Sequence, residues 1–307
     1  MCTSLTLKTK DFYFCRSMDL DYHFGEQIVI TPRRYNLTFK HERQTDNHHA
    51  IIGMATIKND YPLYADGANE MGLCISAQNF RGNAKYEDAT VAGALNLAPY
   101  EIIPYVLASF SSVAEVKKAL SSLKIINTPF DKSTPTTPLH WHIADKNEAC
   151  VLESTPQGVK IYENSVGIMT NNPPFPSQLK NLEKYAHLTP NQPPKVTTTL
   201  GLGMYGLEGD YTSPSRFVRL ATLKKFTKTD QDEAPSLLTA LRLMGTVAIP
   251  RGVTLTEKGA EHYTIYLAII NATKGIYYYQ TSESPNLKCK SFHDCFLGSD
   301  KLEKYFL

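Results

Sequence analysis

The sequence predicts a layered α+β fold. Short runs of aromatic and β-branched residues come in neighbouring groups separated by tight turns, which is typical of antiparallel sheets. Helical segments stand between these groups, and strands and helices do not alternate one by one as they do in a doubly wound parallel sheet. With 307 residues and a hydrophobic content of 42%, the chain has enough apolar material for a large core.

The first thirty residues are predicted to form three strands. Residues 3–7 alternate polar and apolar side chains, as a half-buried strand does. Residues 8–11 form a polar turn, and residues 12–15 begin a second strand. Residues 27–30 are the third. The first two strands should therefore form a hairpin with its turn near Thr9.

Two helices follow from local signals. Ser112 and Glu115 have the spacing of a capping box, which opens a helix with apolar side chains in a helical repeat. Those apolar side chains belong to Val113, Val116, Leu120 and Leu123. Residues 237–244 form the second helix, with Pro235 before it and Gly245 after it.

The remaining strands are predicted in the middle and at the end of the chain. Residues 140–144, 149–153 and 159–162 are separated by polar turns. Residues 263–270 and 276–280 flank a short loop that contains Gly275, so they should form a hairpin.

Composition excludes several classes of protein. The net charge is only +2 and no block of Lys or Arg stands out, which argues against nucleic acid or an anionic membrane as a partner. No apolar run reaches the roughly 18 residues that a membrane span needs. No basic segment followed by an apolar run opens the chain, so we expect a cytoplasmic protein.

The six cysteines form no CxxC pair, so neither zinc nor a redox dithiol is indicated. We expect free thiols, no metal and no other cofactor.

Cys2 is the most informative single residue. Once Met1 is removed, Cys2 carries both a thiol and the α-amine of the chain. The thiol is a nucleophile, and the amine, with an ordinary pKa of roughly 7.7–8.0, can act as its base near neutral pH. A cysteine at the second position can equally be an accident of an exposed terminus. The neighbouring residues must therefore decide between these alternatives.

The predicted hairpin places charged residues beside Cys2. A turn near Thr9 pairs residues whose numbers add up to 18 or 19, so Cys2 should face Arg16 or Ser17, with Asp19 slightly further on. A one-residue slip would turn Arg16 to the other face of the sheet. A guanidinium beside a thiol favours the thiolate, and a carboxylate beside the amine can orient it. A solvated surface ion pair is the alternative.

An enzyme that catalyses acyl transfer also needs hydrogen-bond donors for the developing oxyanion. Asn171, in a segment rich in Asn and Pro, and Asn79 are candidates. Taken singly, an Asn beside a Pro is more often part of a turn.

Two segments, 1–3 (MCT) and 12–19 (FYFCRSMD), resemble the opening of the choloylglycine hydrolases. That family comprises bile salt hydrolases and penicillin V acylases, which are N-terminal nucleophile hydrolases. Further similar segments, in family order, are 66–73 (DGANEMGL), 97–101 (LAPYE), 138–141 (PLHW), 169–175 (MTNNPPF) and 209–219 (GDYTSPSRFVR).

The resemblance implies a four-layer αββα sandwich, built as one catalytic domain over residues 1–307, and assigns the site residues. Cys2 is the implied nucleophile, and Arg16 and Asp19 are its partners. Asn171 and Asn79 are the implied oxyanion residues. Arg216 is the implied second arginine of the site, with Arg219 as the alternative if the alignment is off by one helical turn.

The resemblance also implies a substrate. Bile salt hydrolases typically have Asn at the position of Asn79, where many penicillin V acylases have Tyr. We therefore predict hydrolysis of glycine- or taurine-conjugated bile salts. Penicillin V or another N-acyl amide is the alternative substrate, and a catalytically idle steroid-binding protein is the alternative function. The predicted walls of an apolar steroid pocket are Met18, Leu20, Phe24, Phe130 and Leu139.

Two departures from the family pattern bear on the predictions. Cys15 stands where Gly is common, and is interpreted as a small buried residue, with an oxidation partner of Cys2 as the alternative. Residues 188–201 are shorter than the subunit-embracing loop of tetrameric members. We expect a homo-oligomer, either a tetramer or a dimer.

Two further motifs need an interpretation. His140 and His142 share one face of a strand, which fits a packed pair better than a metal site, because no third ligand follows at a suitable spacing. Residues 201–206 match GxGxxG but lack the strand and helix of a dinucleotide site. A loop near the active site is predicted there.

Overall fold

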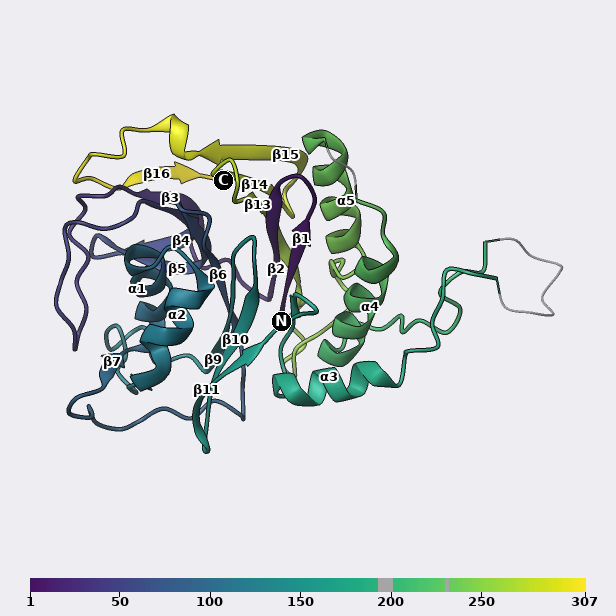
Figure 1. Ribbon diagram of the computed structural model, residues 1–307, viewed down its shortest axis with the longest axis horizontal. Helices are drawn as coiled ribbons and strands as arrows, with labels where there is room; N and C mark the ends of the chain where they lie inside the picture. Colours follow the sequence, from purple (N-terminus) through teal and green to yellow (C-terminus); the bar gives the residue numbers. More distant parts are fainter. Residues whose placement is uncertain (193–200, 230–231) are drawn as a thin grey trace.

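The computed structural model describes residues 1–192, 201–229 and 232–307. It has four layers, in the order helices, sheet, sheet, helices (Figure 1). The αββα prediction is confirmed. The helices are η1 (Pro99–Glu101), α1 (Ile102–Ser109), α2 (Val113–Ala119), η2 (Leu120–Ser122), α3 (Phe175–Glu183), α4 (Ser213–Phe226), α5 (Glu233–Gly245) and η3 (Phe292–Asp294).

The first sheet has six strands and contains the predicted hairpin. Its order is β12 (Ile168–Met169), β1 (Cys2–Lys8), β2 (Phe12–Leu20), β13 (Tyr263–Asn271), β14 (Ile276–Thr281) and β15 (Ser284–Ser291). All of these neighbours pair antiparallel.

The second sheet has eight strands and is also antiparallel throughout. Its order is β11 (Gly158–Glu163), β10 (Ala149–Thr155), β9 (Leu139–Ala144), β6 (Cys74–Asn79), β5 (Tyr61–Asn69), β4 (Ile51–Lys58), β3 (Gln27–Thr31) and β16 (Glu303–Phe306). A separate parallel pair consists of β7 (Leu95–Leu97) and β8 (Leu123–Ile125).

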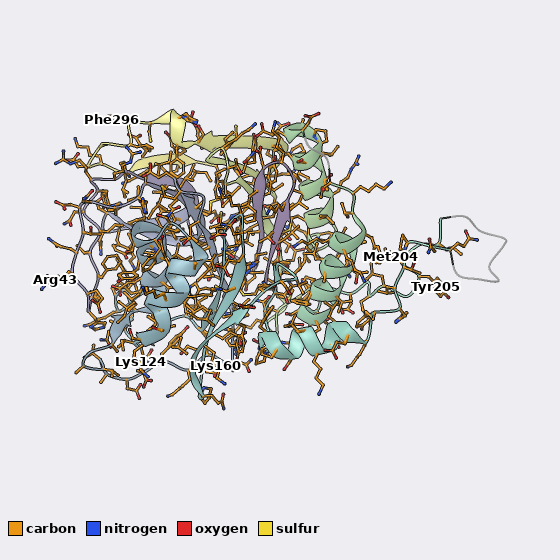
Figure 2. The ribbon with its side chains drawn as sticks, viewed as in Figure 1. Arg43, Lys124, Lys160, Met204, Tyr205 and Phe296 are labelled. Atoms are coloured by element: carbon orange, nitrogen blue, oxygen red, sulfur yellow. The ribbon has the colours of Figure 1, made fainter. Side chains whose placement is uncertain are left out.

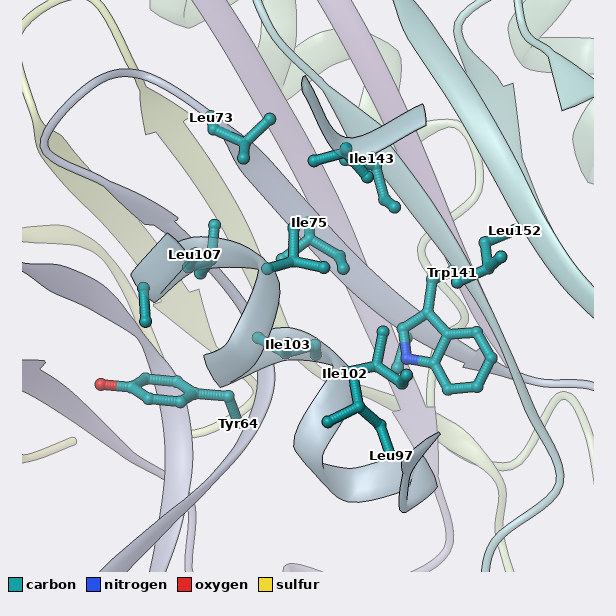
Figure 3. Packing of buried hydrophobic residues seen from close by; sticks show 14 of the residues in the cluster. Tyr64, Leu73, Ile75, Leu97, Ile102, Ile103, Leu107, Trp141, Ile143 and Leu152 are labelled. Atoms are coloured by element: carbon teal, nitrogen blue, oxygen red, sulfur yellow. The ribbon is translucent and has the colours of Figure 1, made fainter. Parts of the chain in front are cut away.

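Three apolar clusters hold the four layers together. One lies between the two sheets and includes Phe14 and Tyr266. A second packs α1 and α2 on the outer face of the eight-stranded sheet, with Trp141 fully buried in it (Figure 3). The third packs α3, α4 and α5 on the six-stranded sheet and includes Phe217. Successive strand residues therefore contribute to different clusters, because their side chains alternate between the faces.

Most predicted elements are confirmed, and the differences have local causes. Only half of the capping box forms: the Ser112 hydroxyl accepts from the Glu115 amide, but the Glu115 carboxylate accepts from the Ser111 amide and not from that of Ser112. Leu123 already belongs to β8. Helix α5 begins at Glu233, so Pro235 lies inside its first turn, where its missing N–H is no loss. Gly245 is the last residue of α5 instead of the residue after it.

The sequence patterns did not predict α1, α3 and α4, nor the short η1 and η3. Helix α1 is apolar on almost every side, and α4 buries both apolar and charged residues, so neither has the clear amphipathic repeat of a surface helix. Within the described residues, no helix is long and apolar enough to cross a bilayer.

The loop predicted at residues 201–206 is confirmed as a loop, but its predicted place beside the site is not. Figure 2 shows Met204 and Tyr205 on an extension that leaves the four layers. The shortened segment 188–201 lies mostly outside the described residues, which omit 193–200.

The cluster under α1 gives a stability prediction. Leu107 is fully buried there, so Leu107→Ala should lower the free energy of unfolding by about 2–5 kcal/mol through lost contacts and a cavity. Leu238 on α5 is 45% exposed, so Leu238→Ala should change it by less than about 0.5 kcal/mol. Urea unfolding of both variants measures the difference, and equal losses would contradict the packing described.

Candidate active site

Cys2 is the first residue of β1 and lies opposite Met18 on β2. The predicted pairing with Arg16 or Ser17 is therefore wrong. Arg16 is two residues from Met18, so its side chain still leaves β2 on the same face as that of Cys2. The Cys2 Sγ lies 3.3 Å from Nη2 of Arg16 and 3.7 Å from the sulfur of Met18.

Arg16 is a buried cation with a buried counter-ion. Its Nη1 donates to Oδ2 of Asp66 over 3.1 Å, and its Nη2 donates to the carbonyl of Ala77 over 2.7 Å. Burial opposes the charge, but neighbouring Tyr266, Cys2 and Asp66 outweigh it and raise the pKa of Arg16. The guanidinium next to the Cys2 thiol therefore stays charged.

Asp66 was not predicted as a site residue, although it opens the matching segment 66–73. It is fully buried on β5. The hydroxyls of Tyr266 and Tyr277 donate to its two carboxylate oxygens over 2.6 and 2.5 Å. The carboxylate is thus held from three sides, with Arg16 as its charged partner.

Asn171 bridges Cys2 and the second arginine. Its Oδ1 accepts from the Cys2 nitrogen over 2.8 Å and from Nη2 of Arg216 over 2.9 Å. Its Nδ2 donates to the main-chain carbonyl of Asn79 over 2.9 Å. Because a guanidinium can only donate, Oδ1 must face Arg216, and the orientation of the amide is fixed.

Helix α4 brings Arg216, and not Arg219, to the site. Arg216 is fully buried, and its Nη1 donates to the Cys2 carbonyl over 2.6 Å. Arg219 instead donates to the carbonyls of Glu208, Asp210 and Thr246. Of the two arginines considered, only Arg216 contacts Cys2 or Asn171.

Asp19 reaches the N-terminus of the chain mainly through its main chain. Its carboxylate points to the other face of β2 and accepts from the hydroxyl of Thr264 over 2.6 Å. Its carbonyl accepts from the Met1 amine over 2.5 Å and lies 2.7 Å from Nε2 of His262. Burial lowers the pKa of the Met1 amine, while the charges of Cys2 and Asp19 act in the opposite direction. No sequence pattern indicated His262 as a site residue.

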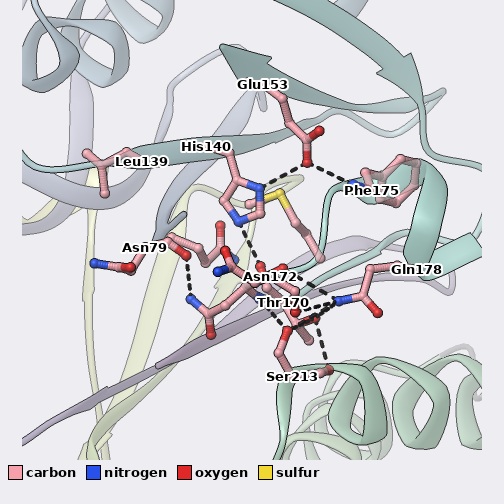
Figure 4. Close-up of polar contacts among 12 residues, drawn as sticks. Asn79, Leu139, His140, Glu153, Thr170, Asn172, Phe175, Gln178 and Ser213 are labelled. Carbon is pink, nitrogen blue, oxygen red and sulfur yellow. Dashed lines mark hydrogen bonds and ion pairs between the residues drawn. The ribbon is translucent and has the colours of Figure 1, made fainter. Parts of the chain in front are cut away.

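The side chain of Asn79 does not face Asn171. Its Oδ1 accepts from the Arg81 amide over 3.0 Å, and only its main-chain carbonyl reaches Asn171. Figure 4 shows this arrangement, with the Asn79 side chain directed away from the Asn171 segment.

The residues predicted to bind the steroid lie in different places. Met18 contacts Cys2, and Leu20 and Phe24 pack at the edge of the cluster between the sheets. Phe130 packs its ring against Tyr61 and Tyr100. Leu139 packs on the cluster beneath α1 and α2.

Comparison with known proteins identifies the family. The family model of the linear amide C–N hydrolases, choloylglycine hydrolase family, matches residues 2–304. The chain belongs to this family.

Relatives from this family match the chain over nearly its whole length. A bile salt hydrolase/transferase of Lactiplantibacillus plantarum is 39% identical over 99% of this chain and 96% of its own. The solved structure of a mutant conjugated bile acid hydrolase from Clostridium perfringens is 34% identical, with a TM-score of 0.94 over 100% of this chain and 97% of its own. A penicillin V acylase from Agrobacterium tumefaciens shares the fold, with a TM-score of 0.79 at 17% identity over 99% of this chain and 90% of its own.

Cys15 does not lie beside Cys2. Its side chain is on the opposite face of β2, in the cluster under α4 and α5. Burial raises the pKa of its thiol to about 12. The interpretation as a small buried residue is confirmed, and the alternative of an oxidation partner for Cys2 is wrong.

The two histidines of β9 form a packed pair, as predicted. His142 contacts Ser4 and Asn164, and burial lowers its pKa to about 3, so it is neutral. His140 contacts Glu153 and the Thr170 carbonyl. Over the ranges that the structure describes, no three His, Cys, Asp or Glu side chains gather to hold a metal ion.

The buried ion pair gives a second stability prediction. Arg16→Met leaves the Asp66 carboxylate uncompensated, so the free energy of unfolding should fall by about 3–5 kcal/mol. Adding Asp66→Asn removes that charge and keeps an acceptor for Tyr266, so the double variant should recover more than half of the loss. Urea unfolding followed by circular dichroism measures both. A double variant no more stable than the single one would contradict the pairing.

Proposed function

We propose that this enzyme hydrolyses the amide bond that joins a bile acid to glycine or taurine, with Cys2 as the nucleophile after Met1 is removed. One observation carries the proposal: the Cys2 thiol lies 3.3 Å from a buried guanidinium while its own nitrogen lies 2.8 Å from Asn171. Relatives named as bile salt hydrolases, matching almost the whole chain, support the choice of substrate.

Cys2 contains both the nucleophile, its thiol, and the base that activates it, its α-amine. Without Met1, the Cys2 nitrogen becomes a primary amine that can take the proton of its own thiol. Arg16 stabilises the thiolate, and Asn171 orients the amine through Oδ1. Asp19 balances the positive charge that the amine gains with the proton.

The oxyanion of the tetrahedral intermediate receives two donors. Nδ2 of Asn171 uses one hydrogen for the Asn79 carbonyl, so its second hydrogen is available. In a strand, the N–H and C=O of one residue point to the same side, so the Asn79 amide faces Asn171 as its carbonyl does. We therefore assign the second donor to the main chain of Asn79 in place of its side chain.

The intermediate then collapses in two steps. The Cys2 ammonium returns its proton to the leaving nitrogen of glycine or taurine, which breaks the C–N bond and leaves a thioester. Water, deprotonated by the amine, attacks the thioester and releases the bile acid and the free thiol.

The remaining assignments are part of the same proposal. Met18, Leu20 and Phe24 would contact the apolar bile acid next to Cys2, because apolar contact dominates such pockets. The roles of Phe130 and Leu139 stay predictions. We further propose one catalytic domain over residues 1–307, a cytoplasmic location, and a homo-oligomer that is a tetramer or a dimer.

The substrate is tested by initial rates on glycocholate and on penicillin V, with one enzyme batch under reducing conditions. We expect a clear preference for glycocholate. A preference for penicillin V would keep the Cys2 mechanism and overturn the substrate. Turnover of neither, with bound bile salt, would favour an idle steroid-binding protein.

The nucleophile is tested by Cys2→Ser. Turnover should fall to background, because a hydroxyl is a far weaker nucleophile than a thiolate, while the melting temperature stays near that of the wild type. The matched control is Cys289→Ser, since Cys289 is an exposed free thiol. Its activity should be unchanged. Substantial hydrolysis by Cys2→Ser would refute the assignment.

A further inference from the structure

We propose that the buried pair His140–Glu153 positions Asn171 and thereby sets the turnover of the enzyme. The inference rests on the proposed function, because it assigns to these residues an effect on the oxyanion donor. Neither residue touches Cys2 in the described contacts. Both act on the main chain on either side of Asn171.

The pair bonds to both ends of the segment that carries Asn171 (Figure 4). On one side, Nε2 of His140 lies 2.9 Å from the carbonyl of Thr170, the residue before Asn171. On the other, Oε1 of Glu153 accepts from the amide of Phe175 over 2.9 Å. The segment 170–175 is thus tied to β9 and β10, strands of the eight-stranded sheet.

The proton positions of the pair follow from its partners. A carbonyl oxygen only accepts, so Nε2 of His140 must carry a hydrogen. Nδ1 faces Oε1 of Glu153 over 3.2 Å, so one proton lies between them. The ring of Phe80 stacks on His140 at 4.3 Å with an angle of 6°, which fixes the plane of the imidazole. The donor to Thr170 therefore has a single direction.

The helical layer holds the same segment from the opposite side. The Asn171 amide donates to the hydroxyl of Ser213, at the start of α4, over 2.9 Å. Nε2 of Gln178, on α3, donates to the Asn172 carbonyl over 3.2 Å. Hydrogen bonds from the eight-stranded sheet and from the layer of α3 and α4 therefore hold the segment around Asn171 from two sides. The pair His140–Glu153 supplies those on the sheet side.

Fold stability alone does not explain a polar pair at this place. His140 is 1% exposed and Glu153 is not exposed at all. Well-packed apolar side chains of similar volume often stabilise a core as well as a buried ion pair does, or better. What they cannot supply is a donor to Thr170 and an acceptor for Phe175. These two hydrogen bonds flank Asn171, so the geometry indicates that the pair serves to place the Asn171 amide.

The experiment compares Glu153→Leu with the wild type. We expect kcat to fall by about 10²-fold, the loss typical of a displaced or missing oxyanion donor, with KM unchanged. The alkylation rate of Cys2 by iodoacetamide, read on the N-terminal peptide by mass spectrometry, should fall much less than kcat, because alkylation forms no oxyanion and depends on Asn171 only through the orientation of the Cys2 amine. Glu153→Gln keeps an acceptor for Phe175, so its kcat should lie between the two.

The control removes another buried carboxylate, at the other end of the β9–β10 pair. Asp145 follows β9 directly and accepts from the amides of Val113 and Asn147 over 2.7 Å each. Asp145→Leu should lower the melting temperature but leave kcat unchanged. An equal fall of kcat in this control would overturn the proposal, because the loss would then reflect general destabilisation.

A double-mutant cycle gives the decisive readout. If Glu153 acts through Asn171, Glu153→Leu should cause no further loss of kcat in an Asn171→Ala background. A full further loss there, or an unchanged kcat in the single variant, would overturn the inference. Should Glu153→Leu fail to fold, the same cycle with Glu153→Gln decides.

Failure of the proposed function can be distinguished from failure of the positioning role of His140–Glu153. If the wild type prefers penicillin V to glycocholate, the bile salt assignment fails and the same series is run on penicillin V. A wild type that turns over neither amide would overturn both proposals.

Discussion

The ion pair between Arg16 and Asp66 is the interaction on which the site depends. Arg16 comes from the six-stranded sheet and Asp66 from the eight-stranded sheet, so the pair joins the two layers. A charge buried at such an interface is strongly unfavourable without its partner. The ion pair therefore constrains both the relative placement of the two sheets and the position of the Arg16 guanidinium. The packing of the two sheets therefore places the charged Arg16 beside the thiol of Cys2.

The remaining polar groups of the site are fixed in the same way, by partners that allow one arrangement each. Arg216 can only donate, so it orients Asn171, and Asn171 in turn orients the Cys2 nitrogen. These groups come from β1, from α4 and from the segment before α3. Because each hydrogen bond uses a defined donor, the free hydrogen of Asn171 has a set direction before any substrate binds. Such preorganised donors are the usual source of large rate effects in acyl transfer.

The sequence predicted local elements, but it did not predict contacts that arise only from the order of the strands in the sheets. Of the two pairings predicted for Cys2, the one with Arg16 differs from the observed register by two residues and leaves Arg16 on the correct face, whereas the one with Ser17 differs by one residue and places it on the wrong face. Asn79 was predicted by residue type, which does not reveal whether its side chain or its main chain faces the site. Asp66 and His262 meet Arg16 and Asp19 only because β5 faces β2 across the sandwich and β13 pairs with β2. No spacing in the chain encodes those contacts.

The hydrogen bonds of Cys2 also explain how the site tolerates the change from precursor to mature enzyme under the proposed mechanism. With Met1 in place, the Cys2 nitrogen is an amide that donates to Oδ1 of Asn171. After Met1 is removed, the same nitrogen is an amine and can donate to the same oxygen. The contacts that are lost join Met1 to the main chain of Asp19 and to Nε2 of His262, and they lie at the end of β1 and not at the thiol. The contacts of Cys2 with Arg16, Asn171 and Arg216 involve no atom of Met1, so removal of Met1 changes the chemistry of the nitrogen and takes away none of these contacts.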